Sequence, residues 1–320
     1  MTKPDADLII VGAGPAGLSS AQYGARSNLN VLVLEQLAPG GQVNNIDVLE
    51  NYPGNFSAAG ALVRSGYEFA QDMYKQAEAF GARFESGSVT GIRREAAGEG
   101  CLFILTLSSG QIRRSPAVVI ATGARRRKLG INGEERFNGK GVSYCATCDG
   151  PFFKNKKIIA VGGGDAACDE AQYLSRLSSQ IILIHRRDRF RAQKALAERI
   201  LKNPHIEVRF NTRLFEIKGD KKVNSVILEN IPLAERTEEE ADAVFIFAGA
   251  EPRAPETDGL DTDAEGYICT DQSMASSIPG LFAAGDVRTT PFRQVATAVA
   301  DGAIAAHSAA EYLDRIKGEV

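Results

Sequence analysis

Two cysteines near the middle of the chain, Cys145 and Cys148, are separated by two residues, and Asp149 follows them directly. Such a pair either binds zinc together with a second pair of ligands or cycles between dithiol and disulfide. The other three cysteines are isolated and no histidine has ligand spacing, so we predict a redox dithiol and no metal. Two inert reduced cysteines are the alternative. Asp149 can relay a proton to or from a sulfur, although a turn would also favour an Asp.

A glycine-rich turn near the N-terminus has the spacing Gly12-x-Gly14-x-x-Gly17. It follows a short apolar run and precedes an Ala-rich segment, an order that predicts a strand, a tight turn and a helix. The glycines let the backbone approach a pyrophosphate, which binds at the positive N-terminus of the helix. Glu35 ends the next apolar run, where a carboxylate can bind the hydroxyls of an unphosphorylated ribose. Together these residues predict a dinucleotide site, with a purely structural turn as the alternative.

The same pattern occurs a second time, because residues 157–185 repeat residues 7–35 with Gly162 and Gly164 in the turn. The acidic residue at the end of the second run is replaced by a basic cluster, which consists of His185, Arg186, Arg187 and Arg191. Guanidinium groups can bind a ribose 2′-phosphate, so this site is predicted to take NADPH rather than NADH. A solvated basic face is the alternative.

Two dinucleotide units in one chain indicate a bound flavin and a diffusible nicotinamide. Gly285-Asp286 ends a later apolar run, where the carboxylate can accept a hydrogen bond from a flavin ribityl hydroxyl; alone, it would indicate only a turn. The fold class that we predict is α/β, with two Rossmann-like dinucleotide-binding domains, the second inserted into the first.

We expect the flavin-binding domain at 1–125 and 252–320 and the NADPH-binding domain, which carries the redox pair, at 126–251. The charged run after residue 124 indicates a hinge, and the Ala-rich tail is expected to return to the first domain. Other expected elements are helices near 61–80 and 294–313, strands near 206–210 and 223–228, and a solvated acidic turn at 238–240.

Composition argues against several classes of function. The 320 residues are 44% hydrophobic and 24% charged, with a net charge of −3, which is ordinary for a globular protein of about two domains. No segment has the roughly 18 unbroken apolar residues of a membrane-spanning helix. A mildly acidic chain does not favour nucleic acid or an anionic membrane. The polar N-terminus lacks the pattern of a signal peptide, so we expect a cytoplasmic protein.

Several short motifs also occur in an order that is typical of one family. They are GxGxxG with Glu35, Gly40-Gly-Gln42, Glu50-Asn-Tyr-Pro-Gly54, CATCDG, GGGxxA, HRRDxxR, GDV and Arg293-Gln294. From end to end the chain resembles the low-molecular-weight, bacterial-type thioredoxin reductases of the pyridine nucleotide-disulfide oxidoreductase family. CATCD and HRRDxxR are specific motifs, whereas the nucleotide glycines are not.

The resemblance implies which residues hold each cofactor. FAD would be held by Gly12, Gly14, Pro15, Ala16, Gly17, Glu35, Gln36, Gly41, Gln42, Asn51, Thr122, Gly123, Gly285, Asp286, Arg293, Gln294 and Val295. NADPH would be held by Gly162, Gly164, Asp165, Ala166, His185, Arg186, Arg187 and Arg191. Cys145 and Cys148 would form the disulfide that the flavin reduces, with Asp149 as the acid–base group.

The resemblance further implies that electrons pass from NADPH through FAD and the dithiol to thioredoxin, in a homodimer whose NADPH domain rotates. Lys140, Phe152 and Phe153 stand where the family docks thioredoxin. The alternatives are the same machinery with another acceptor, as in a peroxiredoxin-type reductase or a dithiol oxidase, and a flavin redox sensor without turnover. Two departures from the family pattern affect cofactor contacts: Asn44 to Asp47 near the flavin and Ala166 near the NADPH pyrophosphate.

Overall fold

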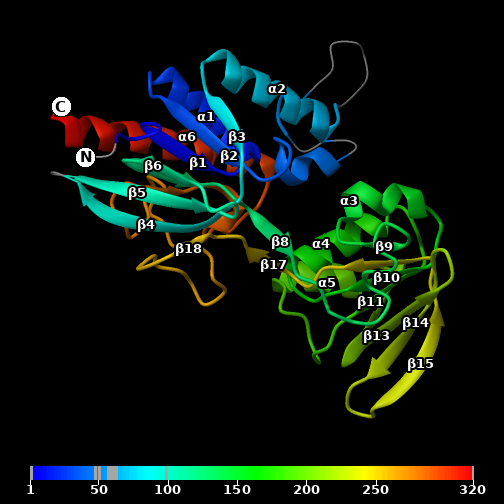
Figure 1. Ribbon diagram of the computed structural model, residues 1–320. Helices are drawn as coiled ribbons and strands as arrows, with labels where there is room; N and C mark the ends of the chain where they lie inside the picture. The colour runs from blue at the N-terminus through cyan, green and yellow to red at the C-terminus, as the bar shows by residue number, and fades with distance from the viewer. Residues whose placement is uncertain (1–2, 47–48, 50–51, 56–63, 98–99, 319–320) are drawn as a thin grey trace. The chain divides into compact units, whose positions relative to one another are not determined.

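The computed structural model describes residues 3–46, 49, 52–55, 64–97 and 100–318 (Figure 1). The chain divides into two compact units, Met1–Arg125 with Glu251–Val320, and Arg126–Ala250. The first unit is therefore made of two separate segments, and the second is inserted between them. Two short strands that pair with each other, β8 (Ala124–Arg126) and β17 (Ala250–Pro252), carry the chain from one unit to the other and back.

A parallel five-stranded sheet forms the centre of the first unit, in the order β19-β7-β1-β2-β3. Its strands are short and rich in β-branched residues, and β1, β7 and β19 are wholly buried, as expected for a parallel sheet covered on both faces. The strands are β1 (Leu8–Val11), β2 (Val31–Glu35), β3 (Arg83–Ser86), β7 (Ala117–Ile120) and β19 (Leu281–Ala283).

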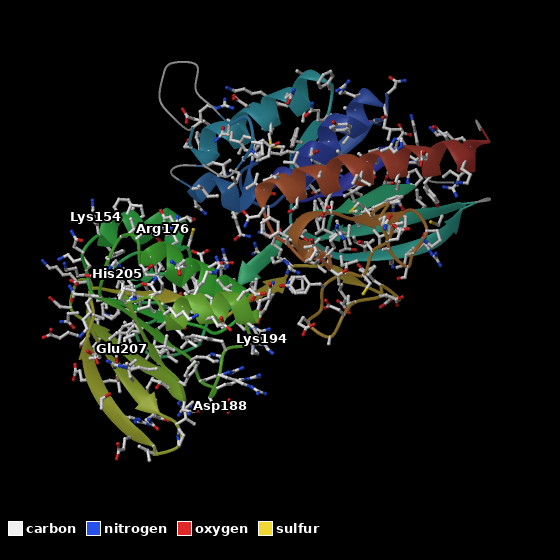
Figure 2. The ribbon with its side chains drawn as sticks, turned by 180° about the vertical axis from the view of Figure 1, so that it is seen from behind. Lys154, Arg176, Asp188, Lys194, His205 and Glu207 are labelled. Atoms are coloured by element: carbon white, nitrogen blue, oxygen red, sulfur yellow. The ribbon has the colours of Figure 1, made fainter. Side chains whose placement is uncertain are left out.

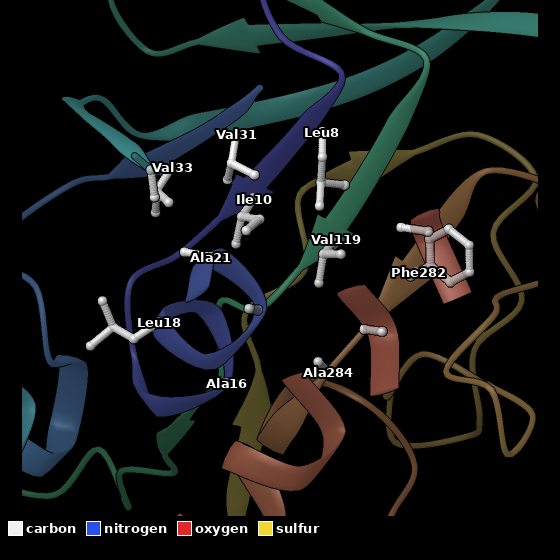
Figure 3. Packing of buried hydrophobic residues seen from close by; sticks show 14 of the residues in the cluster. Leu8, Ile10, Ala16, Leu18, Ala21, Val31, Val33, Val119, Phe282 and Ala284 are labelled. Atoms are coloured by element: carbon white, nitrogen blue, oxygen red, sulfur yellow. The ribbon is translucent and has the colours of Figure 1, made fainter. Parts of the chain in front are cut away.

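Side chains that alternate along these strands belong to two separate cores. Leu8 and Ile10 of β1 pack on the helical face with Leu18 and Ala21, as Figure 3 shows. The opposite face carries Ile9 and its neighbours, which pack against a four-stranded sheet, β18-β4-β5-β6, in which β18 is parallel to β4 and the other pairs are antiparallel. The helices are α1 (Pro15–Arg26), α2 (Gly66–Ala79) and α6 (Val295–Lys317). The strands of this second sheet are β4 (Val89–Ala97), β5 (Gly100–Leu107), β6 (Ile112–Ser115) and β18 (Glu256–Thr257).

The C-terminal helix α6 packs closely on α1, so the ends of the first unit are joined. A Cβ on Gly302 of α6 would lie 2.1 Å from the carbonyl oxygen of Ala16, which means that only glycine permits this approach. The hydroxyls of Ser19 and Ser20 donate to the carbonyl oxygens of Val299 and Gly302, at 2.7 and 2.9 Å. The last helix therefore fixes the position of the helix that follows the first glycine turn.

The second unit repeats the three-layer plan on its own parallel sheet, β12-β11-β10-β16-β9. One face packs against helices and the other against an antiparallel sheet, β13-β14-β15. The strands are β9 (Val142–Ser143), β10 (Ile158–Val161), β11 (Ile181–Ile184), β12 (Ile206–Arg209), β13 (Thr212–Gly219), β14 (Val223–Asn230), β15 (Glu235–Glu240) and β16 (Ala243–Ile246), and the helices are α3 (Ala146–Asp149), α4 (Asp165–Leu174) and α5 (Lys194–Leu201).

One sequence expectation was wrong: the acidic run at 238–240 is not a turn but part of strand β15, which pairs antiparallel with β14. Cations from β12, from β13 and from the chain before β10 form ion pairs with it. Glu239 accepts hydrogen bonds from Lys157 and from Arg209, the latter at 2.8 Å, and Glu238 accepts one from Lys218 at 3.2 Å. Such ion pairs offset the like-charge repulsion within a strand that its composition alone would disfavour.

Two expected helices differ in extent from those observed. The helix near 61–80 is α2, which begins after Ser65, where a capping box with Glu68 satisfies two terminal N–H groups. The tail helix α6 continues past the expected end at 313 to Lys317 and is stopped by Gly318, which adopts a left-handed conformation with φ of 72°. Among the described residues, no helix is long and apolar enough to cross a membrane.

Candidate functional site

The turn between β1 and α1 contains three glycines with different surroundings. A Cβ on Gly12, whose φ is 100°, would lie 2.6 Å from the carbonyl oxygen of Ala121, and one on Gly17 would lie 1.8 Å from that of Gly12. A Cβ on Gly14 would meet no protein atom within 4 Å. Packing of the protein therefore requires the outer glycines, whereas the middle glycine leaves open space at the N-terminus of α1.

Glu35 lies beside this turn at the end of β2, and the backbone holds its carboxylate. One oxygen accepts a hydrogen bond from the N–H of Ala13 at 2.7 Å, and the other accepts one from Leu37 at 2.9 Å. Each carboxylate oxygen can accept a further bond. The orientation of the group is thus fixed before any ligand binds, and its remaining acceptor capacity suits the two hydroxyls of a ribose.

Three buried polar atoms of the first unit have no hydrogen-bond partner within the described parts of the chain: Asn44 Oδ1, Thr122 Oγ1 and Arg293 Nε. Buried polar atoms nearly always have a partner, so these atoms indicate groups that a ligand completes. Asn44 is one of the residues that depart from the family pattern, and its Nδ2 donates to the carbonyl oxygen of Pro39 at 2.9 Å. The open glycine, the fixed carboxylate and these atoms fit a dinucleotide.

Most of the other predicted flavin contacts lie near the same turn. A Cβ on Gly41 would lie 3.1 Å from the Cα of Gly14, and the side chain of Gln42 donates to the carbonyl oxygen of Ala124 at 2.6 Å. Pro15 and Ala16 form the first turn of α1, Gly123 follows Thr122 with φ of 67°, and Gln294 caps α6 immediately before Val295. The side chain of Gln36 is instead engaged with Ser88, whose hydroxyl donates to it at 3.3 Å. Asn51 lies outside the described residues.

Gly285-Asp286 follows β19, and a buried ion pair holds this turn. The N–H of Gly285 donates to Asp301 Oδ2 at 3.1 Å. Arg288 Nε donates to the same oxygen at 2.8 Å, and Nη2 donates to Oδ1 at 3.0 Å. The sequence analysis did not identify Asp301, although a lone charge within the Ala-rich segment of α6 is a signal that could have found it.

The turn of the second unit repeats the arrangement of the first. A Cβ on Gly162 would lie 2.5 Å from the Cβ of Ala167, whereas one on Gly164 would meet nothing within 4 Å. The middle glycine, Gly163, packs on the imidazole of His185, since a Cβ there would lie 2.2 Å from Nδ1. Open space at the N-terminus of α4 again fits a pyrophosphate.

His185 lies at the carboxyl end of β11 and is only 6% exposed. Its Nε2 is buried and has no partner among the described residues. Burial, and then the charges of Arg191, Arg187 and Arg186, lower the pKa of the imidazole, so the ring is neutral at pH 7. The three arginines are exposed. Figure 2 marks this end of the sheet by Asp188 and Lys194 and the opposite end by Arg176 and His205.

Asp165 and Ala166 open α4 and were predicted to bind NADPH. The carboxylate of Asp165 accepts a hydrogen bond from the N–H of Gln193 at 2.7 Å, so the side chain caps the start of α5. Ala166 is exposed and carries no hydroxyl that could bind a phosphate. At these two positions only backbone groups remain to meet the pyrophosphate.

The redox turn starts at the end of β9, and its first cysteine, Cys145, is in a disulfide bond. Cys101, Cys168 and Cys269 are free, whereas the side chain of Cys148 lies outside those that the structure describes. Burial raises the pKa of the Cys168 thiol to about 11, which makes it unreactive near pH 7. No group of three or more His, Cys, Asp or Glu residues is arranged to hold a metal in the described parts of the chain.

Ser143 connects the two ends of the redox turn. Its hydroxyl accepts a hydrogen bond from the N–H of Cys145 at 3.1 Å and donates to Asp149 Oδ2 at 2.5 Å. Ser143 is 3% exposed, so water does not compete for these bonds. The carboxylate of Asp149 is therefore oriented by a residue that the sequence analysis did not identify.

A buried acid, Glu134, lies on the other side of the same turn and is 1% exposed. Its carboxylate accepts hydrogen bonds from the N–H groups of Leu129 and Gly130, at 2.9 and 2.7 Å, and from the hydroxyl of Tyr144 at 2.8 Å. Burial and then this bond raise the pKa of Tyr144, which precedes Cys145. The chain that leaves β8 is thereby tied to the start of the redox turn.

A family model described as pyridine nucleotide-disulphide oxidoreductase matches residues 6–302. The chain belongs to this family. A thioredoxin reductase from Treponema pallidum is 52% identical over 98% of the chain and 99% of its own length, and one from Bacillus subtilis is 39% identical over 97% and 96%. A solved thioredoxin reductase from Lactococcus lactis is 41% identical, with a TM-score of 0.76 over 97% of the chain and all of its own.

These relatives confirm the resemblance to bacterial-type thioredoxin reductases that the motifs indicated, and they confirm the predicted fold class. They match 97–98% of the chain. Membership in this oxidoreductase family implies the use of a flavin and a nicotinamide.

Proposed function

We propose that the protein is an NADPH-dependent thioredoxin reductase that passes electrons through FAD and the Cys145–Cys148 pair to thioredoxin. One observation carries the proposal: each unit has a glycine turn with open space at its helix N-terminus, and the second unit also contains the disulfide of Cys145. The strands that follow the two turns and their helices end in opposite charges, Glu35 after β2 and the arginines beside His185 after β11. We therefore expect the chain to bind two different dinucleotides and to use its own disulfide as a redox-active group.

The first unit fits FAD. When bound, FAD supplies a two-electron carrier between the nicotinamide and the disulfide. The N-terminus of α1 would face the pyrophosphate beside Gly14, and the Glu35 carboxylate would accept hydrogen bonds from the ribose. Thr122 and Arg293 would then gain partners for their buried atoms. Asp286 would accept from a ribityl hydroxyl, because the Asp301 ion pair fixes the turn that carries it.

The second unit fits NADPH. Three exposed guanidinium groups, at Arg186, Arg187 and Arg191, lie close enough to His185 to lower its pKa. Guanidinium groups bind a 2′-phosphate in bidentate fashion, whereas the hydroxyls of NADH would leave their charges unpaired. A neutral imidazole at the same position adds no charge but can form one hydrogen bond through Nε2.

Asp149 is the acid–base group of the proposed reaction. Reduction of the disulfide consumes two electrons and leaves two sulfurs that must take up protons to become thiols. Asp149 follows Cys148 and lies half-buried beside the turn, where the bond from Ser143 fixes its carboxylate. A group held in this way can pass a proton to a sulfur without reorganising.

Thioredoxin is the proposed protein substrate, in keeping with the named activity of the relatives. Phe152, just after the redox turn, is 71% exposed and can contact a partner. Phe153 is less exposed and packs its ring 5.9 Å from that of Phe245, so this second phenylalanine belongs to the core. We further infer a cytoplasmic homodimer, which the family resemblance and the sparse, free cysteines support.

The test is a comparison of the wild type with Cys145→Ser and Cys148→Ser. The purified wild type should release FAD on denaturation and should reduce thioredoxin with NADPH. Each serine variant should lose thioredoxin reduction but should still lose its yellow colour when NADPH is added anaerobically. Thioredoxin reduction by either variant would contradict the role of the dithiol.

A further inference from the structure

Glu170, on the helix that follows the second glycine turn, forms a direct hydrogen bond with the redox turn. One oxygen of its carboxylate accepts the N–H of Ala146 at 2.9 Å. Ala146 lies between the two cysteines, directly after Cys145, and is fully buried. In the described parts of the chain, this hydrogen bond thus connects a side chain of α4 to the peptide group between Cys145 and Ala146.

Glu170 is half-buried, and the N–H that it accepts belongs to a fully buried residue. Burial raises the pKa of its carboxyl, and the neighbouring charge of Asp169 acts in the same direction. The N–H of Ala146 and the charge of Arg126 oppose that rise. A polar contact that is partly shielded from water restricts the backbone more strongly than an exposed one, because water competes less for its partners.

The end of the redox turn also lies directly on α4. A Cβ on Gly150 would come within 2.9 Å of Leu177 and 3.1 Å of Leu174, so the chain after Asp149 has no freedom to move toward the helix. The start of the turn is held by Ser143. Glu170 is therefore the contact that fixes the middle, between the two ends.

We propose that Glu170 is a positioning residue for the redox pair: through the N–H of Ala146 it keeps the sulfur of Cys145 oriented toward Cys148 when the disulfide is open. The proposal rests on the assignment of Cys145 and Cys148 as the redox pair. A closed disulfide restrains its own turn. An open dithiol depends on the surrounding contacts, so the effective concentration of one thiol toward the other falls when the anchor is lost.

Three substitutions separate the hydrogen bond from the charge. Glu170→Gln keeps a carbonyl oxygen as the acceptor but removes the charge. Glu170→Asp keeps the charge but is one methylene shorter, so it does not reach the N–H of Ala146. Glu170→Ala has neither. Glu198→Gln is the matched control, since Glu198 is an exposed acid on α5 whose ion pair with Lys202 spans 3.9 Å.

The main measurement is the equilibrium between dithiol and disulfide in the flavin-loaded protein. It is read by trapping free thiols with an alkylating reagent in buffers of reduced and oxidised dithiothreitol. The Asp and Ala variants should shift this equilibrium about tenfold toward the dithiol, which corresponds to about 1.4 kcal/mol at 25 °C. Both should also reduce thioredoxin about tenfold more slowly. The Gln variant and the Glu198 control should stay within about threefold of the wild type, given the usual spread of such effects.

Several results would overturn the proposal. If the Gln variant shifts like the Ala variant while the Asp variant behaves like the wild type, the charge acts and the hydrogen bond does not. If all three match the wild type, Glu170 positions nothing. If the Ala variant does not fold, the Gln and Asp variants still decide between these outcomes. The equilibrium is measured without thioredoxin, so it remains a valid test even if thioredoxin is not the substrate.

Discussion

Asp301 is the buried acid whose loss should have the largest effect on the first unit, which we propose binds FAD. Its side chain is 10% exposed and that of its partner Arg288 is 14% exposed. Three N–H groups donate to it, two from Arg288 and one from Gly285. In Asp301→Ala the guanidinium would remain buried without its anion, and removing one partner of a buried pair typically costs about 3–5 kcal/mol.

Thermal unfolding followed by circular dichroism measures this cost. For a unit of this size each kcal/mol corresponds to about 2–4 °C, so the melting temperature of Asp301→Ala should fall by at least about 6 °C. The control is Glu95→Gln in the same unit, because the exposed Arg93–Glu95 pair spans 3.8 Å and should not affect stability.

The double variant Arg288→Met with Asp301→Leu distinguishes two effects of Asp301→Ala: the unpaired buried charge of Arg288 and the loss of the hydrogen bond that holds the turn at Gly285. It should regain most of the lost stability, because apolar residues of similar size often replace a buried pair without cost. It should still release FAD more readily than the wild type, since the N–H of Gly285 has no acceptor. A melting temperature of Asp301→Ala within about 2 °C of the wild type would refute the reasoning, given the usual scale of such losses.

Other predictions concern the glycine turns and the basic cluster. Gly17→Ala should unfold the first unit, because its methyl group would lie 1.8 Å from a backbone carbonyl oxygen. Gly14→Ala should keep the melting temperature of the wild type but bind FAD more weakly. Equal melting temperatures for the two variants would contradict this prediction. Arg186→Ser and Arg187→Ser should each lower the preference for NADPH, measured as kcat/KM for NADPH divided by kcat/KM for NADH. The expected decrease is about tenfold, which corresponds to the loss of one charge-assisted hydrogen bond. An unchanged ratio would exclude a contact with the 2′-phosphate. In the folded protein the pKa of His185 lies below its ordinary value of 6.5. As the pH falls, the unfolded chain therefore takes up a proton at this residue before the folded protein does. The free energy of unfolding should consequently decrease below a pH of about 6.5. His185→Gln should flatten this part of a pH series of urea titrations, and an unaltered slope would count against it.

The repeated glycine turns made the fold class predictable from the sequence. Each turn lies between apolar runs short enough to be buried strands, and Glu35 and His185 mark the same position in both copies. The helix expected near 61–80 was placed only approximately. Its observed start is set by the capping box of Ser65 and Glu68, a signal that the sequence contains but that the prediction did not use, and residues 61–63 lie outside the described residues.

What could not be predicted depends on contacts between distant residues. The acidic strand β15 is stable because Lys157 and Arg209, both far away in the sequence, approach Glu239. In the same way, the bond of Glu170 spans 24 residues and reaches a backbone N–H, which leaves no pattern in the residue types. Asp301 is visible in the sequence as a lone charge in an Ala-rich segment, but nothing in the sequence shows that it pairs with Arg288. Motifs thus predict which residues react, and the structure was needed to find the contacts that hold their turns.

Steady-state oxidation of NADPH by the purified yellow protein tests the central claim most directly. The assay contains thioredoxin as the electron acceptor and the chromogenic disulfide DTNB as the final acceptor, with parallel reactions that lack thioredoxin or contain NADH. Fast turnover only when NADPH and thioredoxin are both present is the predicted result. Turnover that does not depend on thioredoxin, or no turnover although NADPH reduces the flavin, would contradict the assignment of thioredoxin as the substrate.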